Sequence, residues 1–153
     1  MNVLVTGNFG YIGSVLVPML IDEGFEVTGL DTDLYRDCTF TGELHPIKQM
    51  NKDIRDITHS DLEGIDAIIH LAGLSNDPLG DYKPELTKQI NEIASVRLAE
   101  IAKQSGVSRF LFASSCSNYG AAGNDYLTET AAFNPVTPYG ESKVAVELKL
   151  LTL

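Results

Sequence analysis

The chain opens with the stretch that decides its fold, Asn2-Val3-Leu4-Val5-Thr6-Gly7-Asn8-Phe9-Gly10-Tyr11-Ile12-Gly13. The apolar run up to Thr6 predicts a buried strand, and the residues from Ile12 to Glu23 have helical spacing. Glycine permits the sharp turn between them, and the N–H groups at a helix start attract anions. Tight packing of the helix against the strand is the alternative explanation of the glycines. We favour a phosphate-binding turn with glycines three residues apart, at Gly7, Gly10 and Gly13.

Short apolar runs and longer helical patterns alternate along the rest of the chain. Strands are predicted at Asn2 to Thr6, Glu26 to Asp31, Ile47 to Met50, Ala67 to Leu71 and Arg109 to Ser114. Further helices are predicted at Pro84 to Gln104 and Tyr139 to Leu151, and Gly24 and Gly106 stand where helices should end. This alternation predicts an α/β fold with a doubly wound parallel sheet, in one domain over residues 1–153.

The composition is that of a soluble globular protein with excess negative charge. Of the 153 residues 44% are hydrophobic, and 11 Lys and Arg against 21 Asp and Glu give a net charge of -10. Such a chain repels nucleic-acid backbones and anionic lipid surfaces. No apolar stretch approaches the roughly 18 to 20 residues of a membrane span, and the N-terminus lacks the basic segment of a signal peptide. With two cysteines outside a Cys-x-x-Cys spacing, a cytoplasmic protein is expected.

Asp31 stands at the end of the second predicted strand, eighteen residues after Gly13. A carboxylate at this place can bind the hydroxyls of an adenosine ribose, and it repels the 2′-phosphate of NADP. Since the nearest arginine, Arg36, does not follow Asp31 directly, the sequence favours NAD as the cofactor. A solvated aspartate in a turn is the alternative.

The glycine turn and Asp31 are two of several motifs that occur in a characteristic order. The others are Asp53-Ile54-Arg55-Asp56, His70-Leu71-Ala72-Gly73, Asn91, Ser114-Ser115-x-x-x-Tyr119-Gly120 and Tyr139-x-x-x-Lys143. With them the chain resembles, over its whole length, the N-terminal half of an extended short-chain dehydrogenase/reductase of the nucleotide-sugar epimerase and dehydratase type. The resemblance implies a Rossmann-like fold that is truncated before the substrate-binding lobe.

The resemblance also implies an NAD site at the ends of the strands. In such relatives an aspartate at the place of Asp53 accepts a hydrogen bond from the adenine amine, while a helix-start aspartate is the alternative here. His70 is expected to be a packed strand-end residue rather than a base, and no metal cluster is expected. The implied cofactor-binding residues are Gly7, Phe9, Gly10, Tyr11, Ile12, Gly13, Asp31, Asp53, Ile54, Leu71, Ala72, Gly73, Ser114, Tyr139 and Lys143.

The catalytic set that the resemblance implies is Ser115, Tyr139, Lys143 and Asn91. Tyr139 and Lys143 are four residues apart, so they share one helix face, where a cationic lysine lowers the pKa of the tyrosine. Tyr139 would take a proton from a sugar hydroxyl while hydride passes to the nicotinamide, and Ser115 would hydrogen-bond the reacting oxygen. In the family an asparagine at the place of Asn91 supports the lysine; an exposed helix position is the alternative.

Three positions bear on the reaction. Dehydratases of this type carry an Asp-Glu pair directly after the catalytic hydroxyl residue, where this chain has Cys116 and Ser117. We therefore expect 4-epimerisation, or a related reduction of a nucleotide sugar, rather than 4,6-dehydration. Ser75 stands where comparable hexose 4-epimerases carry a lysine, which leaves the identity of the sugar open.

The expected partners are a UDP-, GDP-, CDP- or dTDP-linked sugar and a second copy of the chain, because family members dimerise through the helices of Pro84 to Gln104 and Tyr139 to Leu151. The chain ends without a helix cap and looks cut short, so by itself it is expected to be inactive. Two other hypotheses stay open. The chain could be a non-catalytic dinucleotide-binding module, such as a redox-sensing scaffold, or an α/β domain whose function lies in the missing half.

Overall fold

The structure is a computed structural model that describes residues 1–35, 38, 45–75, 77–120 and 126–153. Its contacts divide the chain into two compact units, which we describe separately. The first unit consists of Met1–Ala72 and Leu98–Ala113, and the second of Gly73–Arg97 and Ser114–Leu153. That residues 1–153 make a single domain stays a prediction.

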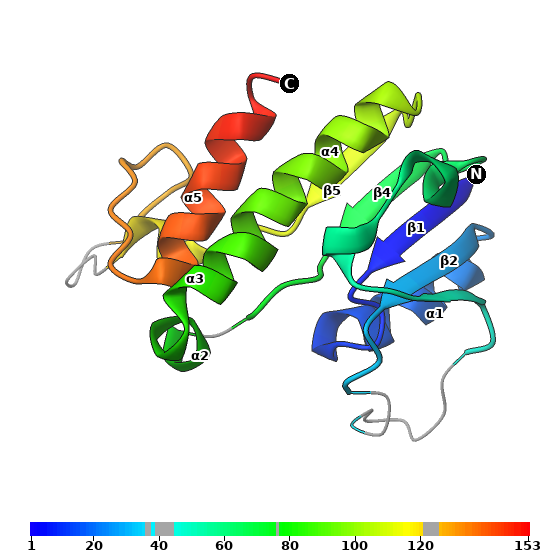
Figure 1. Ribbon diagram of the computed structural model, residues 1–153, viewed down its shortest axis with the longest axis horizontal. Helices are drawn as coiled ribbons and strands as arrows, with labels where there is room; N and C mark the ends of the chain where they lie inside the picture. The colour runs from blue at the N-terminus through cyan, green and yellow to red at the C-terminus, as the bar shows by residue number, and fades with distance from the viewer. Residues whose placement is uncertain (36–37, 39–44, 76, 121–125) are drawn as a thin grey trace. The chain divides into compact units, whose positions relative to one another are not determined.

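A parallel sheet of five strands in the order β3-β2-β1-β4-β5 forms the centre of the first unit (Figure 1). The strands are β1 (Asn2–Thr6), β2 (Glu26–Asp31), β3 (Lys48–Asn51), β4 (Ala67–His70) and β5 (Arg109–Phe112). The α/β fold and the doubly wound parallel sheet are confirmed, and β1 and β2 have the predicted bounds. The other strands shift by one or two residues: β4 ends at His70 rather than Leu71, and β5 at Phe112 rather than Ser114.

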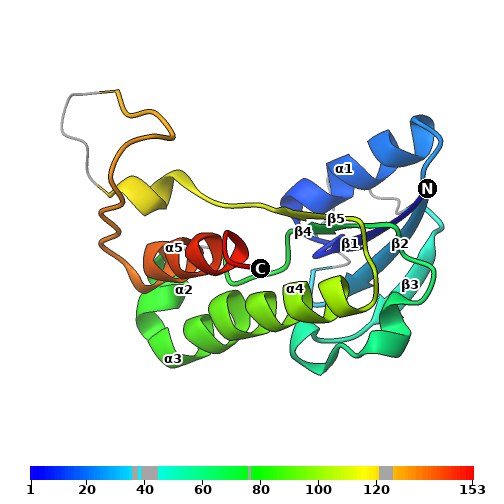
Figure 2. The same ribbon diagram turned by 90° about the horizontal axis from the view of Figure 1, so that it is seen from above.

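Helices cover both faces of this sheet (Figure 2). Helix α1 (Tyr11–Asp22) lies on one face, and the residues of α4 (Ser95–Gln104) that follow Arg97 lie on the other. Side chains alternate between the faces, so Val3 and Val5 of β1 pack with Val17 of α1, while Leu4 points to the opposite face and is fully buried. The core therefore has two layers, one on each side of the sheet.

Glycines end the helices of the first unit where the sequence predicted it. Gly24 follows α1 with a φ of +83° and donates its N–H to the Ile21 carbonyl at 2.9 Å. Gly106 follows α4 with a φ of +78°. Two 3-10 helices, Ile54–Asp56 and His59–Leu62, lie between β3 and β4.

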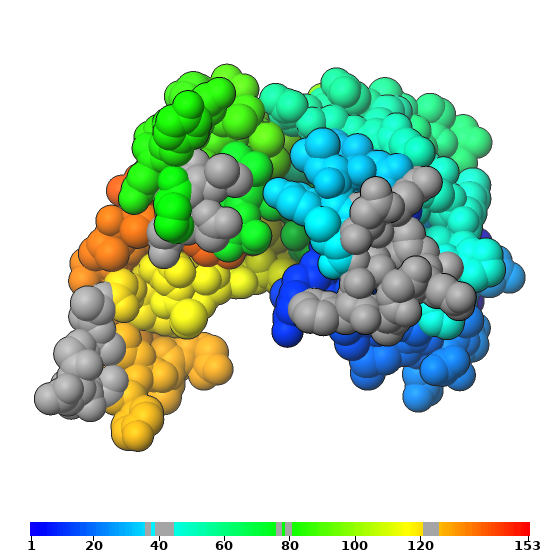
Figure 3. Space-filling model, turned by 90° about the horizontal axis from the view of Figure 1, so that it is seen from below, coloured from blue at the N-terminus to red at the C-terminus, as the bar shows by residue number. Residues whose placement is uncertain are grey.

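The second unit is built from helices. It contains α2 (Asp77–Tyr82), α3 (Pro84–Thr87), a π-helical stretch at Lys88–Ala94, a 3-10 helix at Cys116–Tyr119 and α5 (Pro138–Leu150). Helix α5 packs against α2, α3, the π-helical stretch and the 3-10 helix. In Figure 3 the residues around this 3-10 helix (yellow) and those at the start of α5 (orange) are neighbours.

The segment Pro84 to Gln104 is helical throughout, as predicted, and its middle is a π-helix. An apolar pattern does not distinguish 3.6 residues per turn from the wider turn of a short π-helix. The helix α2, for which the sequence predicts no element, begins at Asp77 with a proline in its first turn, where proline is tolerated.

Among the described residues no helix is both long and apolar enough to cross a membrane. Cys38 and Cys116 are exposed and form no disulfide. A cytoplasmic location stays a prediction.

Ile68 in β4 is fully buried, whereas Ile12 in α1 is 59% exposed. We expect Ile68→Ala to lower the free energy of unfolding by about 2–5 kcal/mol, because it removes buried methyl groups and leaves a cavity. The control Ile12→Ala should change it by less than about 0.5 kcal/mol. Urea unfolding without added ligands measures both, and equal effects would contradict the packing described for the sheet.

Candidate functional site

The predicted site residues belong to both units, and each group is described within its own unit. The first unit holds the glycine turn, Asp31, Asp53, Ile54, Leu71 and Ala72, and the second holds Gly73, Asn91, Ser114, Ser115, Tyr139 and Lys143. The residues predicted to bind the dinucleotide therefore lie mainly in the first unit, and all four predicted catalytic residues lie in the second.

The glycine turn joins β1 to α1 and has no room for side chains at two of its three glycines. Gly7 has a φ of +74°, and a Cβ there would lie 2.7 Å from the backbone nitrogen of Ala72. A Cβ on Gly13 would lie 2.4 Å from the Gly7 carbonyl oxygen. The turn therefore passes close to the main chain after β4, and α1 packs directly on the turn.

The start of α1 fits an anionic ligand. Gly10 is the N-cap residue of α1, and no side chain caps the helix there. The first N–H groups of a helix have no acceptor within the helix and carry partial positive charge. This end of α1 lies at the surface, since Tyr11 and Ile12 are 74% and 59% exposed. These features fit the pyrophosphate of a dinucleotide.

Asp31 is attached to the glycine turn. One of its carboxylate oxygens accepts a hydrogen bond from the Phe9 N–H at 3.1 Å, and the other accepts from the Asp33 N–H at 3.0 Å. The aspartate is therefore held beside the turn and is not simply solvated. Arg36, the nearest arginine in the sequence, lies outside the described residues.

The contacts of Asp53 are those of the alternative interpretation, an aspartate at the start of a helix. Asp53 is the N-cap residue of a 3-10 helix, where its Oδ1 accepts from the Arg55 N–H at 2.9 Å. The Arg55 guanidinium also donates to both carboxylate oxygens, at 3.0 and 2.7 Å, and this interaction lowers the pKa of Asp53. Ile54 is 4% exposed, so its side chain belongs to the core. An adenine contact by this pair stays a prediction.

His70 is a packed strand-end residue, as predicted. The residue is 1% exposed, and its Nδ1 shares a 2.6 Å hydrogen bond with the Thr6 hydroxyl. The same Thr6 oxygen lies 3.3 Å from the Ala72 N–H, which donates to it. Leu71 donates its N–H to the Thr6 carbonyl at 3.1 Å. These bonds fix Leu71 and Ala72 beside the glycine turn.

Asn91 lies in the π-helical stretch of the second unit and is 2% exposed, so the alternative of an exposed helix position is wrong. Its Oδ1 accepts from the Leu74 N–H at 2.8 Å, and its Nδ2 donates to the Leu74 carbonyl at 2.9 Å. A Cβ on Gly73 would lie 3.0 Å from Asn91 Oδ1. Asn91 therefore holds the segment after β4, a contact that the sequence did not reveal.

Tyr139 and Lys143 lie in the first two turns of α5. Thr137 caps this helix by accepting from the Gly140 N–H at 3.1 Å, and Pro138 occupies its first turn. Lys143 is 7% exposed, and its Nζ lies 5.6 Å from the centre of the Tyr139 ring. Burial lowers the pKa of Lys143 to about 8. A lysine ammonium is thus placed beside a phenol, as the spacing predicted.

Ser115 precedes the 3-10 helix Cys116–Tyr119 and caps it. Its Oγ accepts from the Ser117 N–H at 3.2 Å and donates to the Ser117 hydroxyl at 3.1 Å. Gly140 lets α5 approach this helix, because a Cβ there would lie 2.8 Å from the Ser117 carbonyl oxygen. The hydroxyls of Ser115 and Tyr139 share no hydrogen bond in the described structure. The two residues lie on elements that pack against each other, since the 3-10 helix that Ser115 caps contacts α5.

Glu147 and Asn118 form a cluster with Ser114 that sequence reasoning missed. The Ser114 hydroxyl donates to Glu147 Oε1, and Asn118 Nδ2 donates to the same oxygen at 2.7 Å and to Ser114 Oγ at 3.0 Å. The hydroxyl of Ser114, a residue predicted to bind the cofactor, thus donates to a side chain of α5. A signal for Glu147 was its place four residues after Lys143, on the same helix face.

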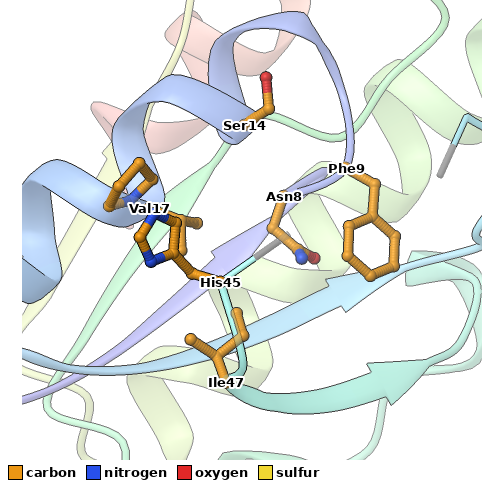
Figure 4. Close-up of a pocket in the computed structure, with 7 residues that line it drawn as sticks. Asn8, Phe9, Ser14, Val17, His45 and Ile47 are labelled. Atoms are coloured by element: carbon orange, nitrogen blue, oxygen red, sulfur yellow. The ribbon is translucent and has the colours of Figure 1, made fainter. Parts of the chain in front are cut away.

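A small pocket opens beside the glycine turn (Figure 4). It is lined by Asn8, Phe9, Ser14, Val17, Pro18, His45 and Ile47. Its volume of about 20 Å³ corresponds to roughly one water molecule. The described residues contain no group of three or more His, Cys, Asp and Glu side chains that could bind a metal ion.

Comparison with known proteins matches this chain to a protein family. Residues 3–152 match the model of the NAD dependent epimerase/dehydratase family. The chain belongs to this family. The UDP-glucose 4-epimerase of Lactobacillus helveticus is 33% identical over 156 residues, which cover 96% of this chain and 45% of that enzyme.

Solved structures of the family superpose closely on this chain. MoeE5 in complex with UDP-glucose and NAD is 33% identical with a TM-score of 0.87, and the match covers 99% of this chain and 48% of MoeE5. TunA, an NAD-dependent NDP-hexosamine 5,6-dehydratase involved in tunicamycin biosynthesis, is 27% identical with a TM-score of 0.90, and the match covers 99% and 50%. The chain thus spans about half the length of these relatives and has their Rossmann-like fold.

The burial of Lys143 makes its charge a liability for the fold. The folded protein releases the lysine proton near pH 8, while an unfolded chain keeps it up to about pH 10.5. Unfolding therefore takes up a proton between these values, and this lysine lets stability rise with pH there. We expect Lys143→Met to stabilise the protein at pH 7 by on the order of 2–3 kcal/mol and to lose this advantage towards pH 10.5.

Chemical denaturation across pH 7 to 10.5 measures this difference. The control Lys149→Met replaces an exposed lysine on the same helix and should change stability by less than about 0.5 kcal/mol. A gain from Lys143→Met that stays constant with pH would show that buried charge is not its cause.

Proposed function

We propose that the protein of which this chain is part is an NAD-dependent nucleotide-sugar epimerase or reductase. The observation that carries the proposal is the buried Lys143 ammonium beside the Tyr139 ring, on a helix that packs against the segment containing Ser115. The family match supports NAD as the cofactor, and relatives that bind UDP-sugars support a nucleotide sugar as the substrate. The proposal concerns the whole protein, because this chain spans about half the length of its relatives.

Tyr139 acts as the base in this proposal. At pH 7 Lys143 is mainly cationic, since its pKa is about 8, and a nearby cation stabilises the phenolate of Tyr139. Tyr139 then takes the proton of a sugar hydroxyl as the C–H bond on the same carbon breaks. Ser115 donates to the sugar oxygen and steadies the developing charge, after its hydroxyl turns away from Ser117. NAD supplies the hydride acceptor when bound.

An epimerase returns the hydride to the opposite face of the same carbon, and Tyr139 returns the proton, so no net NADH forms. A reductase instead consumes NADH. We favour either reaction over 4,6-dehydration, because Cys116 and Ser117 provide no carboxyl group after Ser115 to eliminate water. In the first unit, the glycine turn binds the pyrophosphate and Asp31 the adenosine ribose. Leu71, Ala72 and Gly73 allow close passage of the cofactor.

Turnover tests the proposal directly. The full-length protein is incubated with NAD or NADH and a panel of UDP-, GDP-, CDP- and dTDP-sugars, while NADH absorbance and product stereochemistry are followed. Inverted sugar without net NADH identifies an epimerase, and stoichiometric loss of NADH identifies a reductase. NAD binding without conversion of any sugar would contradict the proposal and favour the non-catalytic binding module.

Tyr139→Phe should lower kcat by about 10²–10⁴-fold, because the variant lacks the hydroxyl that moves the proton. The dissociation constant of NAD should change less than about threefold, since most cofactor contacts are elsewhere. Isothermal titration and steady-state rates measure these values, with Tyr82→Phe as the control at a 77% exposed tyrosine. Unchanged turnover would remove Tyr139 from the mechanism.

We also propose a homodimer formed through α5 and the helical segment Pro84 to Gln104. Both elements leave apolar side chains at the surface, with Ile93 and Leu148 each 52% exposed. Sedimentation equilibrium should give twice the chain mass for the full-length protein, and Leu148→Asp should shift the distribution towards the monomer. A monomeric mass for the unmodified protein at micromolar concentration would contradict the dimer.

A further inference from the structure

Asn8, the residue after the first glycine of the turn, has a buried side chain. It is 3% exposed, so its amide is directed into the protein and not towards a ligand at the surface. Asn8 Nδ2 donates to Gln49 Oε1 in β3 at 2.9 Å, and Gln49 Nε2 lies 3.4 Å from Asn8 Oδ1 in a longer return bond. In Figure 4 the amide of Asn8 lies beneath the turn, beside the strands.

Gly29 in β2 provides the space in which the two amides meet. Gly29 lies between Val5 of β1 and Gln49 of β3 in the sheet register. A Cβ at Gly29 would lie 2.4 Å from Gln49 Oε1 and 2.5 Å from Asn8 Nδ2. Any side chain at this position would therefore force the amides apart. The glycine is required by the amide pair rather than by an unusual backbone angle, since its φ is not in the left-handed region.

The Asn8–Gln49 pair attaches the glycine turn to the sheet. Glycine-rich turns have many accessible backbone conformations, and a ligand that binds one of them must offset the ordering of the rest. In this turn the neighbouring Phe9 N–H is already fixed by Asp31 of β2. The Asn8 side chain adds a second attachment, to β3, so two adjacent residues tie the turn to two different strands.

We propose that Asn8 and Gln49 are positioning residues that hold the turn ready for a dinucleotide pyrophosphate, so that these two amides set the affinity for the cofactor without contacting it. This inference rests on the proposed NAD site. In this inference the amide pair raises the affinity for NAD because it orders the turn before the ligand binds, so that less conformational entropy is lost on binding. A purely structural role of the pair, in holding β3 on the sheet, would change stability and leave cofactor affinity alone.

A double-mutant cycle on the full-length protein tests this inference. Asn8→Ala and Gln49→Met each break the amide pair, and Gln49→Met keeps most of the side-chain volume. Each should weaken NAD binding in isothermal titration by about fivefold, the value expected for the loss of one hydrogen bond. The NAD affinity of the double variant should equal that of the single variant that binds NAD more weakly, because the second change has no bond left to remove.

Val27→Ala is the matched control. Val27 lies in β2 two residues before Gly29 and belongs to the core cluster on the face of α1. It should lower the free energy of unfolding and leave the NAD dissociation constant within about twofold. Hydrogen exchange without NAD gives a second readout: the segment of residues 6–13 should exchange faster in Asn8→Ala, but not in Val27→Ala.

The outcomes separate this inference from the proposal beneath it. If the unmodified protein does not bind NAD, the proposed function fails and the inference fails with it. If the unmodified protein binds NAD and the Asn8 and Gln49 variants bind it equally well, the inference alone is overturned. Losses that multiply in the double variant would also overturn it. Asn8→Ser and Gly29→Ala repeat the test should one of the first variants fail to fold.

Discussion

The first unit depends on the close approach of the turn at Gly7 to the main chain of Ala72. A Cβ at Gly7 would lie 2.7 Å from the Ala72 nitrogen, and one at Gly13 would meet the turn itself. Because these β-carbons are missing, the end of β1, the start of α1 and the end of β4 converge. Thr6 completes this junction by bonding both His70 and Ala72. The part of the surface that we propose for the pyrophosphate is thus made by main chain.

This use of the main chain suits an acidic protein. With a net charge of -10 the chain offers a long-range field that repels a dinucleotide, so attraction has to be local. Backbone N–H groups at a helix start provide it without a formal charge to desolvate. The second unit contains a buried cation, Lys143. Burial lowers its pKa to about 8, because a charge is unfavourable away from water.

The elements that could be predicted from sequence are those specified by local pattern. The bounds of β1 and β2 follow from apolar runs that end in a turn, and Gly24 and Gly106 have the positive φ that a helix end favours. Lys143 was placed correctly beside Tyr139 because four residues make about one helical turn. Motif order then supplied the family, which no single motif would have done.

The features that escaped prediction are polar pairs between distant residues. Asn91 binds Leu74, Asn8 binds Gln49 and Ser114 binds Glu147, and in each pair the spacing carries no periodic signal. Asp53 shows the opposite difficulty, because a local partner, Arg55, occupies a carboxylate that the family pattern assigns to adenine. Such contacts depend on how the elements come together, so a sequence pattern can indicate the polar residue but not its partner.

The π-helical stretch at Lys88–Ala94 affects how this segment tolerates changes in length. A π-turn contains one residue more than the α-helical turn that it replaces. Removing one residue from this stretch would allow a regular α-helix whose two flanks keep about the same orientation, whereas a deletion in a regular α-helix turns one flank by about 100° relative to the other. The change would instead be felt inside the stretch, where Asn91 binds the main chain of Leu74. The segment can therefore lose a residue without turning its ends, at the expense of the contact made by Asn91.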